Sequence, residues 1–225
     1  MPSGLLCALA LGAVHLFANR SKVLGWVWRG RFLSFAGGVS FAYVFIDLLP
    51  ALGKGQPVLK RTFGELIPYF DRHTYLIALL GMLFYYGIEK GKEARGTAWL
   101  SMSGYLLFNL FVGASLADNT NPEIQPLALF TIAMAMHYFV RDHDLRARHV
   151  QWALVATLLA GYAIGIWAHI PDALVALTVS FLAGGVILNV LHYELPKREG
   201  GGFPSFLLGA LLYAAILLGV GEIPV

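Results

Sequence analysis

Several side chains that could bind a cation or carry a proton lie in the apolar stretch from Trp99 to Asp142. Asn109 is near the middle of its first half, and His137, Arg141 and Asp142 lie toward its end. Ionisable side chains are costly in an apolar environment, so they indicate a functional site by default. An asparagine carbonyl can ligate a hard cation, and a neutral histidine can bind zinc or relay a proton. We therefore expect the chemistry of this chain to centre on this stretch.

Each of these residues also has a simpler interpretation. Asn109 could be a hydrogen-bonded link between packed helices. Arg141 follows His137 by four residues on the same helical face, and a fixed cation there argues against a metal. Its long side chain could instead extend to the membrane interface. The other polar candidates in apolar segments are Asp47, His192 and Glu194.

The composition places the chain among polytopic membrane proteins. Hydrophobic residues make up 58% of it and charged residues only 13%, with a mean hydropathy of +0.68. The single cysteine, Cys7, excludes an internal disulfide and a cysteine-based zinc site. The net charge of +3 comes from basic residues in short loops, which set membrane topology and do not indicate a nucleic-acid partner.

The apolar segments predict an all-α membrane bundle of about eight transmembrane helices, because each span needs roughly 20 apolar residues. Most Lys and Arg residues fall in the loops on one side, which predicts that both chain termini face outside. The longer loop from Gly53 to Arg72 is expected outside, with a short interfacial helix. The spans are expected at residues 3–18, 32–53, 73–90, 98–118, 124–141, 150–169, 171–193 and 204–221.

An internal repeat divides this single transmembrane domain of residues 1–225. Ala36-Gly37-Gly38-Val39 is followed by Asp47, and Ala183-Gly184-Gly185-Val186 is followed by Glu194, with the same spacing from Gly37 and Gly184. The two copies have opposite predicted orientations, which is typical of the inverted repeats of transporters. The repeats cover residues 3–90 and 150–221 and enclose a central pair of helices at 98–141, giving a 3+2+3 arrangement.

In this arrangement the chain resembles the ZIP (Zrt/Irt-like) family of metal transporters. The family's fourth helix carries His-Asn-x-x-(Asp/Glu)-Gly, where this chain has Phe108-Asn109-Leu110-Phe111-Val112-Gly113. The fifth helix carries His-Glu-x-Pro-(His/Glu)-(Glu/Gly), where this chain has His137-Tyr138-Phe139-Val140-Arg141-Asp142. The second span, with Phe35-Ala36-Gly37-Gly38-Val39 and Leu48-Leu49-Pro50, is also similar to the family's second helix.

The resemblance implies a metal pathway between the two central helices, with an altered site. Asn109, His137 and Asp142 are the implied metal ligands. At four other positions of the two motifs this chain has a different residue from the family, namely Phe108, Val112, Tyr138 and Arg141. The substrate would be a divalent metal ion such as Zn, Mn or Fe, and no resident cofactor is expected. The lipid bilayer is the expected partner, with a homodimer implied by resemblance and a bacterial inner membrane as the location.

Three functions are considered. The first is a ZIP-like transporter of a divalent metal or another small solute. The second is a transport-inactive relative acting as a sensor or partner subunit, with Arg141 as a built-in cation in place of the metal. The third, a remote alternative, is an intramembrane enzyme pairing Ser115 with His192, which the predicted topology places on opposite sides. We expect no enzyme activity.

Overall fold

The computed structural model describes residues 2–18, 26–63, 73–91, 98–117, 124–143, 145, 147–168, 171–195 and 202–221. Within these ranges the chain is helical and contains no strand, as the sequence predicts. Each predicted span coincides with a helix or a continuous helical run. The elements are α1 (Pro2–Phe17), α2 (Trp26–Tyr43), η2 (Val44–Leu48, a π-helix), α3 (Leu49–Phe63), α4 (His73–Gly91), α5 (Ala98–Ala117), α6 (Ile124–Asp142), α7 (Arg148–Trp167), α8 (Asp172–Asn189), η3 (Val190–Glu194, a π-helix) and α9 (Phe203–Gly221).

The helical run that starts with α2 extends further than predicted. It continues through η2 and α3 to Phe63, although a loop was expected from Gly53. Leu52 and Leu59 on α3 are buried, and α3 packs against α4 and α8, so burial of one face keeps this stretch helical. Gln56 accepts hydrogen bonds from the backbone and hydroxyl of Thr74 and so ties α3 to the start of α4. The rest of the expected loop, residues 64–72, lies outside the described ranges, as does the link at 118–123.

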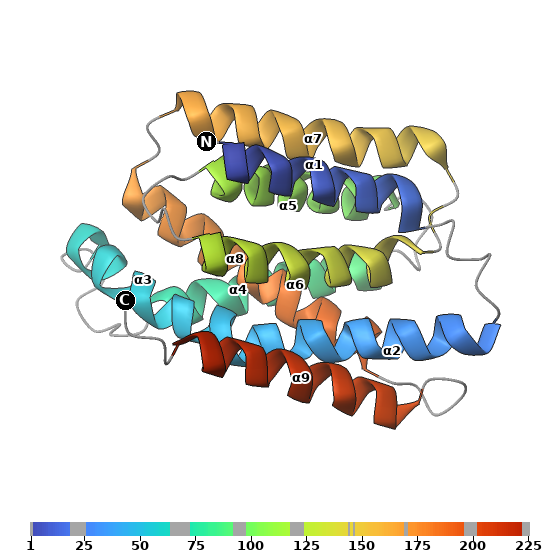
Figure 1. Ribbon diagram of the computed structural model, residues 1–225. Coiled ribbons are helices and arrows are strands. Elements are labelled where there is room, and N and C mark those ends of the chain that lie inside the picture. The colour runs from blue at the N-terminus through green and yellow to red at the C-terminus, as the bar shows by residue number, and fades with distance from the viewer. Residues whose placement is uncertain are drawn as a thin grey trace.

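The helices form a bundle with α6 at its centre (Figure 1). Helices α1, α5 and α7 group on one side of α6, and α2 packs with α9 on the other. Helix α4 packs along α8. The start of α1 and the end of α9 lie at the same end of the bundle, which agrees with the expectation that both termini are on one side.

Three helix pairs approach each other closely through reciprocal glycines. In each pair, a Cβ atom added to the glycine of one helix would collide with a backbone carbonyl oxygen of the other. Small residues allow such close packing in a bilayer, where apolar burial does not drive helices together. The pairs are Gly38 with Gly209 (α2 and α9), Gly81 with Gly184 (α4 and α8) and Gly113 with Gly161 (α5 and α7).

The two π segments follow these glycines at equal distances. η2 begins six residues after Gly38, and η3 begins six residues after Gly184. The internal repeat in the sequence instead paired Gly37 with Gly184. The helix contacts pair Gly38 with Gly184, because Gly38 packs against the backbone of α9 in the way that Gly184 packs against the backbone of α4. Asp47 and Glu194 are therefore not at equivalent positions.

The surface of the bundle is strongly apolar. Three helical runs among the described residues are long and apolar enough to cross a membrane, namely Gly30–Phe63, Arg148–Trp167 and Asp172–Glu194. Three shorter apolar helices accompany them, at Ser3–Phe17, Met102–Ala117 and Phe203–Gly219. Leu208, Leu211 and Leu218 on α9 are each about 60% exposed. Apolar side chains so exposed along whole helices are compatible with an integral membrane protein.

Candidate functional site

His15, on α1, lies at the centre of a buried polar cluster. Its side chain is fully buried, and both of its ring nitrogens have partners. Nδ1 contacts Oδ2 of Asp142 at the end of α6, and Nε2 lies 2.7 Å from Oδ1 of Asn109 on α5. One imidazole ring thereby joins α1 to α5 and α6, which both lie far from α1 in the sequence.

The hydrogen-bond partners indicate which atoms of this cluster carry a proton. The amide nitrogen of Asn109 donates to the backbone oxygen of Tyr105 at 3.0 Å, so Oδ1 is the atom that faces His15. Because Oδ1 can only accept, Nε2 of His15 carries a proton. The contact between Nδ1 of His15 and Oδ2 of Asp142 needs one further proton, which the two atoms share. The Tyr105 hydroxyl donates to Oδ1 of Asp142 at 2.8 Å and satisfies that carboxylate.

A second buried pair joins α6 to η3. Nδ1 of His137 lies 2.5 Å from Oε1 of Glu194, and both side chains are at most 3% exposed. The other carboxylate oxygen of Glu194, Oε2, has no hydrogen-bond partner among the described residues. A Cβ atom on Gly37 would collide with the backbone of Glu194, so this glycine lets α2 approach η3.

Tyr138 fills the space beside His15. It is fully buried, and its ring centroid lies 4.2 Å from that of His15. Its centroid lies 6.2 Å from those of both Phe108 and His137. Phe108 and Val112 are also buried. Aromatic rings thus occupy the space near the two histidines.

The predicted metal ligands do not converge on one point. Asn109 and Asp142 contact His15, whereas His137 contacts Glu194. Among the described residues, no three His, Cys, Asp or Glu side chains form a group that could hold a metal ion. The arrangement contains two buried His–carboxylate pairs, His15 with Asp142 and His137 with Glu194.

Arg141 does not take the position between Asn109 and Asp142, which His15 fills. Its guanidinium lies over the rings of Tyr105, at 5.4 Å from the centroid, and Tyr193, at 5.2 Å. The role of Arg141 as a cation in place of the metal stays a prediction, with Tyr105 and Tyr193 as the described neighbours of its guanidinium.

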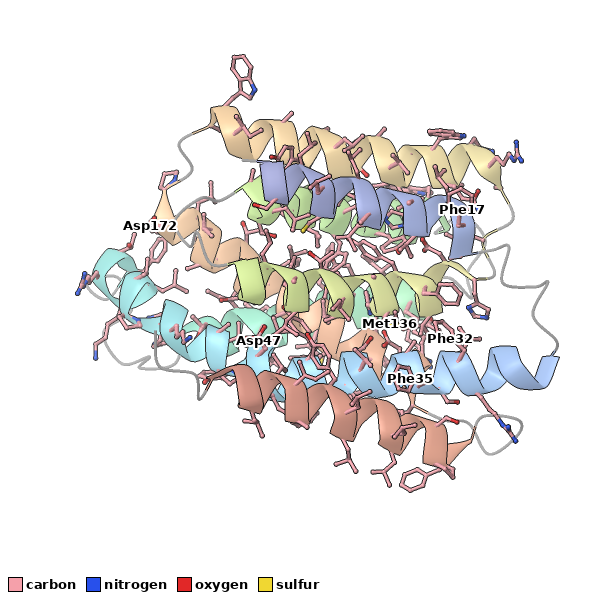
Figure 2. The ribbon with its side chains drawn as sticks, viewed as in Figure 1. Phe17, Phe32, Phe35, Asp47, Met136 and Asp172 are labelled. Carbon is pink, nitrogen blue, oxygen red and sulfur yellow. The ribbon has the colours of Figure 1, made fainter. Side chains whose placement is uncertain are left out.

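The remaining candidates lie apart from the cluster. Asp47 is exposed and lies in the half of the bundle that holds Asp172, whereas Phe17, two residues after His15, lies toward the other end (Figure 2). His192 is exposed, 3.7 Å from Glu89. Glu194, two residues later, is buried, as expected for positions that do not share a helical face.

The serine considered for an intramembrane enzyme has a local partner instead. The Ser115 hydroxyl donates to the backbone oxygen of Val112 at 2.8 Å, a common bond within a helix. His192 contacts Glu89, so its described partner is also different.

Sequence reasoning did not assign His15 and Tyr105 to the site. Each was visible as a polar residue in an apolar segment. Their partners could not be read from spacing, because His15 is 127 residues from Asp142 and 94 from Asn109.

Comparison with known proteins found no matching family model, no matching curated protein and no matching solved structure.

Proposed function

We propose that this chain is a ZIP-like integral membrane transporter that moves a small solute along α5 and α6. The observation that carries the proposal is the presence of two buried ionisable pairs, His15 with Asp142 and His137 with Glu194, in a bundle with an apolar surface. Ionisable groups inside a membrane bundle are costly and are typical of solute and proton pathways. A purely structural bundle of this size would gain more from apolar side chains at these positions.

The packing of the outer helices supports a transporter scaffold. The contact of α2 with α9 and that of α4 with α8 use the same glycine arrangement, and each is followed by a π segment. Interrupted helices at corresponding positions of two halves are typical of transporters built from inverted repeats. This supports the proposed eight-helix, 3+2+3 architecture, and a bacterial inner membrane is the proposed location.

The ZIP resemblance implies a divalent metal ion as substrate, but the site geometry favours another solute. Tight binding of Zn²⁺ needs three or four ligands. Asn109 and Asp142 are hydrogen-bonded to His15, and Glu194 to His137, so a metal would have to open both pairs. We therefore propose that the solute is not a bare divalent metal bound at these residues.

Uptake into proteoliposomes tests the proposal. The purified protein is assayed with Zn²⁺, Mn²⁺ and Fe²⁺ and with the solute class inferred in the next section. His137→Ala should reduce uptake of the transported solute by about tenfold, because it leaves Glu194 buried without its partner. His149→Ala is the matched control, since His149 is exposed at the start of α7, and it should leave uptake unchanged.

A transport-inactive protein is the second candidate. It is favoured by Tyr138, which is fully buried against His15 beside two closed ion pairs. Absence of uptake of every solute by folded wild-type protein would replace the transporter proposal with this one.

A further inference from the structure

A small pocket, open on one side, lies between α4, α5, α6 and α8. Arg141, Glu89 and Asn189 contribute polar side chains to its lining, together with the rings of Tyr105 and Tyr193. Phe108 also lines it, and the ring centroid of Phe108 lies 5.9 Å from that of His137. The ring of Phe108 therefore lies between the pocket and the buried His137–Glu194 pair.

Arg141 presents a guanidinium to this pocket that no described carboxylate neutralises. Its contacts within the described ranges are the faces of Tyr105 and Tyr193, whose centroids lie 5.4 and 5.2 Å away. Stacking on two rings fixes the plane of the guanidinium but uses none of its five N–H donors in an ion pair. A planar guanidinium held in this way is suited to an oxyanion such as a carboxylate.

Glu89 brings the opposite charge to the same pocket. Its side chain is 20% exposed, and its ion-pair contact among the described residues is with His192, at 3.7 Å. No ion pair joins Glu89 to Arg141, although both line the pocket. An isolated anion would be attracted by Arg141 and repelled by Glu89, whereas a ligand with both charges complements both residues.

We infer that this pocket binds a small zwitterion of the amino-acid type, with its carboxylate on Arg141 and its ammonium group toward Glu89. Asn189 supplies an amide that can donate or accept at either end. The inference deepens the proposed transport function, because a zwitterion would be the solute. Binding itself can be tested without transport.

Three related probes separate the two charges. Glycine carries both, acetate lacks the ammonium group, and methylamine lacks the carboxylate. Binding to the full-length protein in detergent is measured by thermal shift and by ligand-observed NMR. Glycine is expected to bind at least about tenfold more tightly than either single-charge probe, which corresponds to about 1.4 kcal/mol.

Charge-removing variants assign the two ends of the ligand. Arg141→Gln should abolish the preference of the pocket for glycine over methylamine, and Glu89→Gln should abolish its preference for glycine over acetate. Arg148→Gln is the matched control, because Arg148 is exposed at the start of α7 and does not line the pocket. It should leave all three affinities unchanged.

A zwitterionic lipid headgroup presents the same chemistry as a soluble zwitterion. Repeating the glycine titration in nanodiscs with and without phosphatidylethanolamine separates the two sources. Loss of glycine binding only when this lipid is present would identify the headgroup as the ligand.

Equal affinity for glycine and acetate, or affinities that Arg141→Gln leaves unchanged, would overturn the inference. Glycine binding without glycine uptake in proteoliposomes would preserve the site and reject the zwitterion as the transported solute. The two failures are thereby distinguishable.

Discussion

At the scale of single residues, the central feature is a buried histidine that contacts polar side chains of two other helices. Nε2 of His15 donates to Asn109, and Nδ1 shares a proton with Asp142; the ZIP motifs place metal ligands at both of these positions. The same two residues can therefore belong to a metal-like motif and to a closed structural cluster.

Removing His15 should expose the dependence of the fold on this cluster. His15→Ala leaves the Asp142 carboxylate buried with only the Tyr105 hydroxyl as a described hydrogen-bond donor. Breaking a buried ion pair in this way should lower the free energy of unfolding by about 3–5 kcal/mol. Reversible unfolding in mixed micelles measures the change, with the exposed His149→Ala as a control expected within about 0.5 kcal/mol of wild type.

The double variant distinguishes this pair from simple loss of packing. In His15→Ala/Asp142→Ala both charges are gone, so the double change should cost clearly less than the sum of the two single changes. Additive costs would show that the two side chains are not energetically coupled, contrary to the geometry.

The site could be predicted from sequence only in part. Asn109, His137 and Asp142 are all buried polar residues, as their place in apolar segments suggested. Their partners could not be predicted, because a polar side chain in an apolar helix indicates a need for a partner without naming it. The contact of His15 with Asp142 arises only when α1 packs along α6.

At the scale of helices, the apolar segments predicted every helical run, but two features depended on neighbours. The helix ending at Phe63 persists because α4 and α8 bury one of its faces. η2 lies between α2 and α3, and η3 ends the helical run of α8; neither contains a proline, so composition did not reveal them. Local sequence fixes where helices form, whereas tertiary contacts adjust how they end and bend.

The reciprocal glycines should be intolerant of even one added methyl group. A Cβ atom on Gly38 would be overlapped by backbone atoms of Phe206 and Ala210, which cannot rotate away as a side chain can. Gly38→Ala should therefore destabilise the protein by about 1–3 kcal/mol through overpacking.

Gly87→Ala provides the matched comparison, because Gly87 is also helical and nothing lies within 4 Å of an added Cβ atom. It should be neutral or stabilising by about 0.5–1 kcal/mol, since alanine is the better helix former. Unfolding in mixed micelles measures both variants. Equal effects would mean that the α2–α9 contact is looser than described.

At the scale of the whole molecule, the two ends of the bundle carry different polar residues. Arg141 and Glu89 line the pocket near the ends of α6 and α4, and the positive-inside rule predicts that this end faces the cytoplasm. Asp47 and Asp172 lie toward the opposite end (Figure 2). The proposed zwitterion pocket would then open to the cytoplasm, with the ring of Phe108 between it and the buried His137–Glu194 pair.

This orientation predicts opposite labelling of two exposed positions. Because Cys7 is the single cysteine, a Cys7→Ser background carries no other thiol. His149 and Asp172 are exposed at the starts of α7 and α8, which the eight-span arrangement assigns to opposite sides. In intact cells, Asp172→Cys should react with a membrane-impermeant maleimide, and His149→Cys should react only after permeabilisation. The reverse pattern would place the pocket on the outer face, and a carrier with that pocket open would then take up its solute from outside. Equal labelling of both positions in intact cells would mean that α7 does not separate the two sides, contrary to the proposed architecture.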